Sequence, residues 1–122
     1  KRISKKIYLP KITLNSILKK YFKDKLTIDY GLNIKKDEFK INSYGCILPS
    51  PLTIGYALSI ASAGKAKNIL LFGFDGYKDN DVKQIEMESL LNMYNKLNKK
   101  SPLFTLTPST YLIKEADINT FI

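Results

Sequence analysis

The chain has 122 residues, of which 44% are apolar and 25% charged, a composition typical of one soluble globular domain with a modest core. No apolar run reaches the roughly 18 residues of a membrane span, and no apolar stretch follows the basic N-terminal residues as it would in a signal peptide. The net charge of +9 would suit nucleic acid, but the lysines are spread along the sequence and Arg2 is its one arginine, so nucleic acid is not an expected partner.

The sequence contains no histidine and a single cysteine, Cys46. Histidine is the commonest general base and the commonest metal ligand, so we expect neither a metal site nor a cofactor. Cys46 has no second cysteine with which to form a disulfide within the chain, and it lies in an apolar, strand-like run. We interpret it as a buried small hydrophobe rather than a nucleophile, and we expect a reducing, cytoplasmic setting.

The first third of the sequence predicts a strand, a helix and a second strand. Residues 5–9 form the first strand, which Pro10 stops. Apolar residues then recur at helical spacing, with Thr13 as the candidate N-cap. Residues 26–30 predict a strand closed by Gly31, in which Asp29 either faces solvent or points into a site. Residues 39–41 alternate like an exposed edge strand, and residues 42–45 favour a turn.

The central part has the strongest pattern. Ser50 followed by Pro51 predicts an N-cap with proline at the first helical position, and Gly64 predicts a left-handed C-cap. Residues 69–72 form a continuous apolar run between turn residues, which predicts a strand buried on both faces of a parallel sheet.

The last part predicts one more helix and one more strand. The helix spans residues 81–97 with an apolar face, and Asp79 or Asn80 is its candidate cap. Residues 103–106 predict the final strand, which leads into a polar loop at residues 107–111. The tail from residue 112 to residue 122 carries no strong signal. Together the elements predict one α/β domain over residues 1–122, Rossmann-like and three-layered, with a mostly parallel sheet flanked by helices.

Three loops follow strands or open a helix on the same side of such a sheet, where ligands of open α/β folds bind. A helix start offers free N–H groups to an anion, and glycines let backbone approach a ligand closely. We therefore predict one ligand-binding corner built from three loops, whose residues are Ser50, Thr53, Gly73, Asp75, Gly76, Tyr77, Thr107, Ser109, Thr110 and Tyr111.

A plainer interpretation exists for single members of this set, because Ser50 can cap its helix and Asp75 can cap a turn. The sequence has no P-loop, no dinucleotide fingerprint and no G-x-S-x-G motif. We expect this domain alone not to be catalytic; if one residue is catalytic, it is Asp75.

The run PSPLTIGYALSIASAGKAKNILLFGFDGYKDND, followed by KQIEMESLL and LFTLTPSTY, resembles the C-terminal domain of bacterial aldolase-like proteins. These proteins belong with the hydroxymethylglutaryl-CoA lyase and 4-hydroxy-2-oxovalerate aldolase group and occur in surface-polysaccharide settings, such as lipopolysaccharide or capsule. The resemblance implies that the chain is the C-terminal fragment of a longer, aldolase- or lyase-like protein, and that a catalytic barrel precedes it as a partner domain.

The same pattern is more distantly similar to bacterial sialyltransferases and motility-associated proteins that handle nonulosonic acids. That similarity implies a CMP-sugar site in which Ser50 and Thr53 lie near a phosphate or carboxylate. Asp75 and Tyr77 would then face nucleotide or sugar, and Pro108 and Ser109 would face the nucleotide. The catalytic histidine of the sialyltransferases has no counterpart in this sequence.

Three functions follow as alternatives. The first is an accessory domain of polysaccharide biosynthesis that binds an anionic sugar or a nucleotide sugar. The second is a sialyltransferase-like glycosyltransferase, with Asp75 or Glu86 as base and Tyr77 or Tyr111 stabilising the leaving phosphate. The third is a structural module that docks on the barrel without a ligand, which predicts an exposed apolar patch away from the strand ends.

Overall fold

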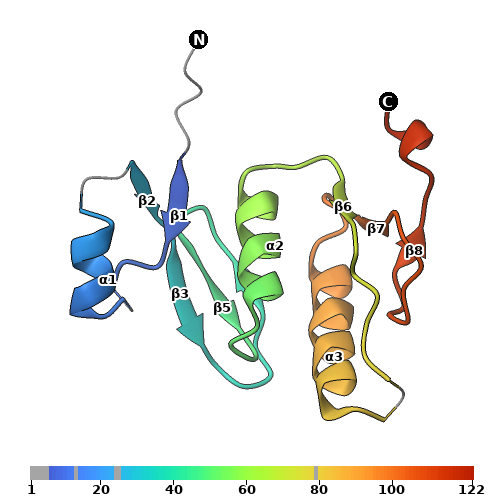
Figure 1. The fold of residues 1–122 in the computed structure, drawn as a ribbon, viewed down its shortest axis with the longest axis horizontal. Helices are drawn as coiled ribbons and strands as arrows, with labels where there is room; N and C mark the ends of the chain where they lie inside the picture. Colours follow the sequence, from blue (N-terminus) through green and yellow to red (C-terminus); the bar gives the residue numbers. More distant parts are fainter. Residues whose placement is uncertain (1–5, 13, 24–25, 79) are drawn as a thin grey trace.

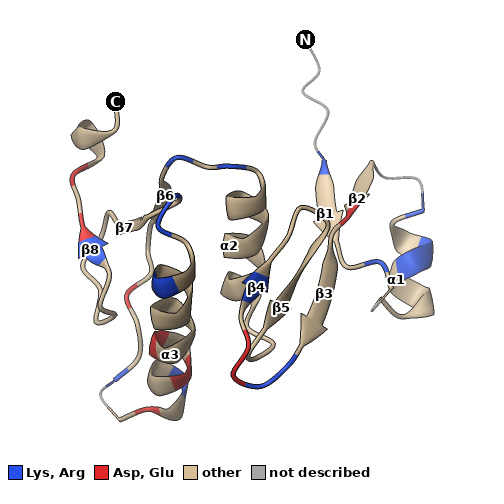
Figure 2. Cartoon of the chain, turned by 180° about the vertical axis from the view of Figure 1, so that it is seen from behind, with Lys and Arg blue, Asp and Glu red and all other residues tan. Residues whose placement is uncertain are grey.

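The computed structural model describes residues 6–12, 14–23, 26–78 and 80–122. Over these residues the chain is a mixed α/β fold with three α-helices, one 3-10 turn and three small sheets (Figure 1). No helix in this described part is long and apolar enough to cross a membrane. Lysines are dispersed over α1, β4, the turn after α2 and β8 rather than gathered on one element (Figure 2).

The N-terminal unit consists of β1 (Ile7–Leu9), α1 (Ser16–Tyr21) and β2 (Thr27–Asp29), and its two strands are parallel. The strands lie where the sequence predicts them. The predicted cap Thr13 lies outside the described residues; the N-cap of α1 is instead Asn15, whose Oδ1 accepts from the Leu18 N–H at 3.0 Å.

β2 ends at Asp29, before Gly31 as predicted, but Gly31 does not lead into a turn, because β3 (Gly31–Ile34) starts there after Tyr30. β3 pairs in parallel with β5 (Gly45–Leu48), and β4 (Lys40–Ile41) pairs with β5 in antiparallel fashion. Glycine is needed at this point for close strand pairing: a Cβ on Gly45 would lie 2.9 Å from the Gly31 Cα. The predicted edge strand is confirmed as β4.

Helix α2 (Thr53–Ala63) begins later than predicted, and Ser50 is not its cap. The N-cap is Leu52, which has no side-chain cap hydrogen bond. The backbone of Leu52 is still extended, with φ −84° and ψ 125°, so the helix starts two residues after Pro51. The proline at the first helical position was therefore a wrong prediction.

The C-terminal end of α2 also differs from the prediction. Gly64 has a φ of −74°, so it is not the left-handed residue. Lys65 takes that conformation with a φ of 59°. Its N–H donates to Ser62 O at 2.9 Å and the Ala66 N–H donates to Ala61 O at 3.0 Å, the paired bonds of a Schellman motif.

The C-terminal unit is a parallel sheet in the order β6 (Ile69–Leu71), β7 (Leu103–Thr105) and β8 (Lys114–Glu115). β6 is not buried on both faces as predicted: Leu70, which points to the opposite face from Ile69 and Leu71, is 38% exposed, and Phe72, just beyond the strand, is 80% exposed. The tail, for which no element was predicted, forms β8 and a 3-10 turn (Ile118–Thr120).

Helix α3 (Val82–Leu97) matches the predicted helix to within one residue. Its cap is Asp81, whose Oδ1 accepts from the Lys83 N–H at 2.8 Å; Asn80 is not the cap, and Asp79 lies outside the described residues. Leu90, Leu91 and Tyr94 are buried as the apolar face predicts, whereas Leu97 is 48% exposed.

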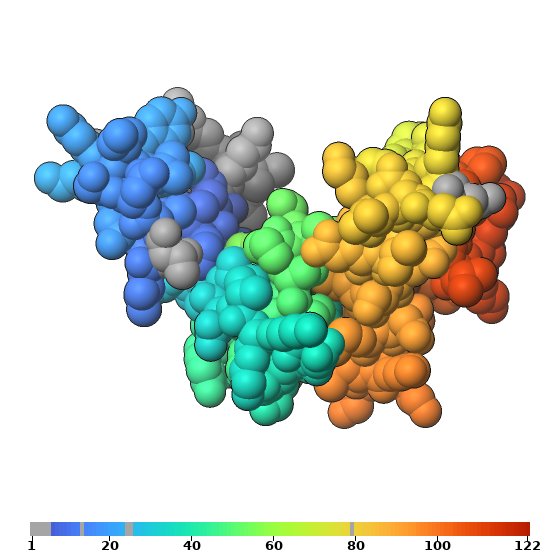
Figure 3. All heavy atoms as spheres, turned by 90° about the horizontal axis from the view of Figure 1, so that it is seen from below, coloured from blue at the N-terminus to red at the C-terminus, as the bar shows by residue number. Residues whose placement is uncertain are grey.

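The main core lies where β5, α2 and α3 meet. A Cβ on Gly55 of α2 would lie 2.9 Å from Leu90 Cδ1 and 3.2 Å from Leu48 Cδ1, so α2 packs directly on both neighbours. Tyr94 is fully buried, and its hydroxyl contacts Ser62 Oγ at 2.7 Å and donates to Ser101 O at 2.8 Å. Viewed from below, the two ends of the chain form lobes on either side of the recessed central segment (Figure 3).

Candidate functional site

Two of the three predicted loops are joined by direct hydrogen bonds. The Gly73 N–H donates to Thr107 Oγ1 at 3.0 Å, and Ser109 Oγ donates to Phe74 O at 2.7 Å. The Thr110 N–H donates to Asp75 O at 2.8 Å. The loops meet because they follow neighbouring parallel strands, β6 and β7, whose carboxyl ends lie side by side. Loops 73–77 and 107–111 therefore form one corner.

Both glycines of loop 73–77 have backbone angles that other residues rarely adopt. Gly73 has a φ of 66° and Gly76 a φ of 99°. Gly76 is also in close contact: a Cβ there would lie 1.9 Å from Thr110 Oγ1. Gly73 has open space at the corresponding position, with no atom within 4 Å. Glycine at position 73 is therefore needed only for the positive φ of the turn. Glycine at position 76 is needed both for its positive φ and because a side chain there would collide with the other loop.

Gln84, a buried residue of α3, hydrogen-bonds to both loops of this corner. Sequence reasoning did not identify it. It is 5% exposed, and its Oε1 accepts from the Tyr77 N–H at 2.9 Å and from Thr110 Oγ1 at 3.3 Å. Its Nε2 donates to Glu88 Oε1 at 2.8 Å. A signal was present in the sequence, because Gln84 stands three residues before Met87 and so falls on the apolar face of the helix.

The third predicted loop, residues 50–53, does not share these bonds. Ser50 and Thr53 lie at the start of α2, after β5, and β5 belongs to a different sheet from β6 and β7. In the described part of the chain, no hydrogen bond connects residues 50–53 to loop 73–77 or loop 107–111. The expected meeting of all three loops rested on one continuous sheet, and the strands are divided among three.

The residues of the corner divide into those that face inward and those that remain open. Tyr111 is buried at 5% exposure, its ring lies 5.0 Å from that of Phe74, and burial raises the pKa of its hydroxyl. Asp75 is exposed, and its carboxylate has no hydrogen-bond partner among the described residues. Tyr77 is 42% exposed, with Lys83 Nζ 5.6 Å from its ring centre. Asp75 and Tyr77 are therefore the predicted residues free to meet a ligand.

A cavity of about 610 Å³ adjoins the corner at the carboxyl ends of β6, β7 and β8. The residues that line it are Phe72, Leu106, Glu115, Ala116, Asp117 and Ile118. Phe72 presents an exposed aromatic ring, and Glu115 presents an exposed carboxylate. Asp117 already accepts from the Asn119 N–H at 2.8 Å. Sequence reasoning did not identify Glu115 and Asp117, because a two-residue strand has too little periodicity to be recognised.

The described residues contain no group of three or more histidine, cysteine or acidic side chains placed to hold a metal ion. Cys46 is 4% exposed in β5, as predicted for a small hydrophobe. Burial raises the pKa of its thiol, and the hydrogen bond with Ser59 opposes that rise in part. A thiol held in its protonated form is a poor nucleophile.

No protein-family model matches the chain, and no curated protein or solved structure matches it.

Proposed function

We propose that the chain is a Rossmann-like accessory domain that binds an anionic sugar or a nucleotide sugar, such as a CMP-sugar, at loops 73–77 and 107–111. The proposal extends to a cytoplasmic, aldolase-like protein of bacterial surface-polysaccharide biosynthesis, which the sequence resemblance implies. One observation carries the binding site: two interlocked loops with left-handed glycines stand at the carboxyl ends of adjacent parallel strands, β6 and β7.

The open groups of the corner suit the parts of such a ligand. The exposed ring of Phe72 offers an apolar face to a sugar ring, and Glu115 can accept hydrogen bonds from sugar hydroxyls. Lys83, beside the ring of Tyr77, supplies positive charge for a carboxylate or phosphate. Because Glu115 and Asp117 are acidic, the anionic group of the ligand lies toward Lys83 and its hydroxyls lie toward the cavity.

Isothermal titration calorimetry tests the proposal with CMP, a CMP-sugar and a free sialic-acid-like sugar. We expect saturable binding of at least one of them, weakened by Phe72→Ala and by Lys83→Ala. Leu112→Ala is the matched control, because Leu112 is 91% exposed and does not line the cavity. Absence of binding across the panel by a sample with a cooperative unfolding transition refutes the proposal.

A docking module is the second candidate, and exposed apolar side chains away from β6–β8 favour it. Ile12 is 87% exposed, Ile17 76% and Tyr21 64%. Large exposed apolar patches mark interaction sites in soluble proteins. Hydrogen exchange of the chain alone and within the longer protein that the resemblance implies tests this candidate. Protection confined to α1 and residues 10–12 supports docking, and unchanged exchange there contradicts it.

A further inference from the structure

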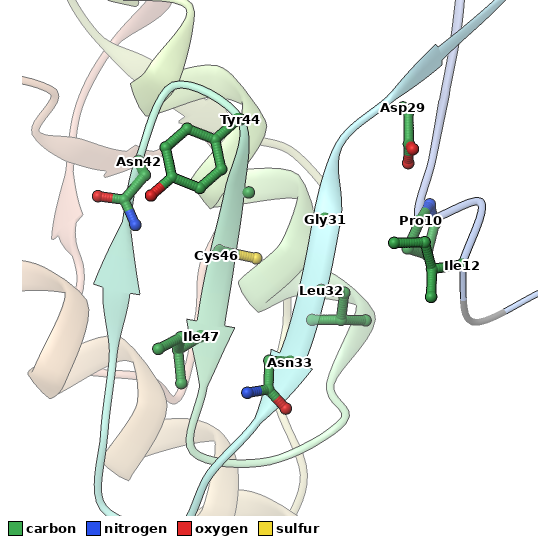
Figure 4. Close-up of a pocket in the computed structure, with 11 residues that line it drawn as sticks. Pro10, Ile12, Asp29, Gly31, Leu32, Asn33, Asn42, Tyr44, Cys46 and Ile47 are labelled. Atoms are coloured by element: carbon green, nitrogen blue, oxygen red, sulfur yellow. The ribbon is translucent and has the colours of Figure 1, made fainter.

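A second concave region lies in the other half of the molecule, over strands β3 and β5. It has a volume of about 560 Å³, within the roughly 300–1,000 Å³ of small-molecule sites. Its floor is the paired backbone of Gly31 and Gly45, where no side chain rises into the space. Figure 4 shows Tyr44 and Asn42 on one side of this β3–β5 groove and Pro10, Ile12 and Asp29 on the other.

Two exposed apolar side chains, Tyr44 and Ile12, form part of the walls of the β3–β5 groove. Tyr44 is 76% exposed and Ile12 is 87% exposed, on opposite sides of the floor. The Tyr44 ring contacts no other aromatic ring in the part of the chain that the structure describes. A flat ring laid on the glycine floor would meet the face or edge of Tyr44 and the aliphatic side chain of Ile12.

Polar groups with unused hydrogen-bonding capacity surround this apolar space. The side-chain amides of Asn33 and Asn42 have no hydrogen-bond partner among the described residues. Asp29 Oδ1 accepts from the Lys11 N–H at 3.0 Å, and the second carboxylate oxygen remains available. An amide offers a donor and an acceptor together, which matches the edge of a nitrogen heterocycle.

We infer that the β3–β5 groove binds a nitrogen heterocycle of nucleobase size. The ring stacks against Tyr44 above the glycine floor, and Asn33, Asn42 and Asp29 bond to its donors and acceptors. The site is separate from loops 73–77 and 107–111, which lie in the sheet of β6 and β7, and no phosphate is required. A side chain at position 45 would collide with the backbone of Gly31 and force β3 away from β5, so it would also disrupt the floor of the groove.

Amide NMR spectra recorded during titration with adenosine, cytidine, guanosine or uridine test the inference. Ribose is the control ligand, because it lacks the nitrogen heterocycle. We expect at least one nucleoside to give saturable shifts at Gly31, Gly45 and their neighbours, and ribose to give none. Tyr44→Ala weakens that binding by about fivefold or more, the low end of a base–aromatic stack. Asn42→Ala also weakens it, because it removes a hydrogen-bonding edge without filling the groove.

Tyr21→Ala is the matched control, since it removes an exposed tyrosine of α1 that lines neither the groove nor the cavity beside loops 73–77 and 107–111. Equal weakening by Tyr44→Ala and Tyr21→Ala overturns the inference, as does binding by Tyr44→Ala that is as tight as in the unchanged protein. Absence of saturable shifts with all four nucleosides overturns it as well. Nucleoside shifts confined to loops 73–77 and 107–111 overturn it while supporting the proposed function, so the two failures are distinguishable.

Discussion

Replacing Gly76 with alanine should separate the two loops of the candidate site. The new Cβ would lie 1.9 Å from Thr110 Oγ1 and 3.2 Å from Thr110 Cβ, so the Thr110 side chain or its loop must move. A φ of 99° adds backbone strain, which costs about 1–2 kcal/mol for an L-residue. Loss of the Thr110 N–H bond to Asp75 O adds about 1 kcal/mol. We expect Gly76→Ala to lower the free energy of unfolding by about 2–3 kcal/mol.

Gly73→Ala is the control that isolates strain from contact. Gly73 has a left-handed φ of 66° but open space at the Cβ position, so this variant should lose only about 1 kcal/mol. Urea denaturation followed by circular dichroism measures both values, provided that the slope with urea is unchanged. Thr110→Ala removes the nearest atom, so in the double variant Gly76→Ala should cost less than in the unchanged chain. Equal destabilisation by Gly73→Ala and Gly76→Ala, with no coupling to Thr110, refutes the reasoning.

Three further predictions concern polar groups. Gln84→Leu should destabilise by about 1–3 kcal/mol in the same urea assay, because the Tyr77 N–H loses its acceptor; an unchanged midpoint contradicts this role. Burial raises the pKa of Tyr30 and Tyr56 to about 12, so the neutral hydroxyls stabilise the fold fully below pH 10 and that stabilisation is lost as pH rises from 10 to 12. Tyr56→Phe should therefore reduce the fall in thermal midpoint between pH 9 and pH 11.5, and an undiminished fall argues against it. Asp75→Asn should leave stability unchanged, since the carboxylate is exposed. It should abolish sugar transfer only if the glycosyltransferase alternative is correct, and a turnover assay of the parent protein decides this.

The long amphipathic helix α3 was the most predictable element. Its sixteen residues repeat an apolar face over more than four turns, so tertiary context had little room to override the pattern. The caps were less predictable, because several residues near each helix end have suitable side chains and backbone geometry selects one. Asn15 and Asp81 were selected, and neither was the residue predicted.

The burial of β6 could not be predicted from its own residues. Ile69, Leu70 and Leu71 form an apolar run that suits a central parallel strand, but strand order is set by distant segments. β7 and β8 lie on one side of β6, and its other edge has no strand partner in the described part of the chain. Because β5 and β6 are not paired, Ser50 and Thr53 follow a strand of a different sheet from the one that carries Asp75 and Tyr77.

The two kinds of residue in the corner should respond differently to substitution. Thr107, Ser109 and Gln84 use their polar atoms to join the loops, so they act on a ligand only through the shape of the loops. Phe72 and Tyr77 are exposed and available to a ligand. Replacing a joining residue should therefore lower stability and sugar affinity together, whereas Phe72→Ala should lower affinity alone. If affinity falls only when stability falls, the corner is a structural junction and the ligand lies elsewhere.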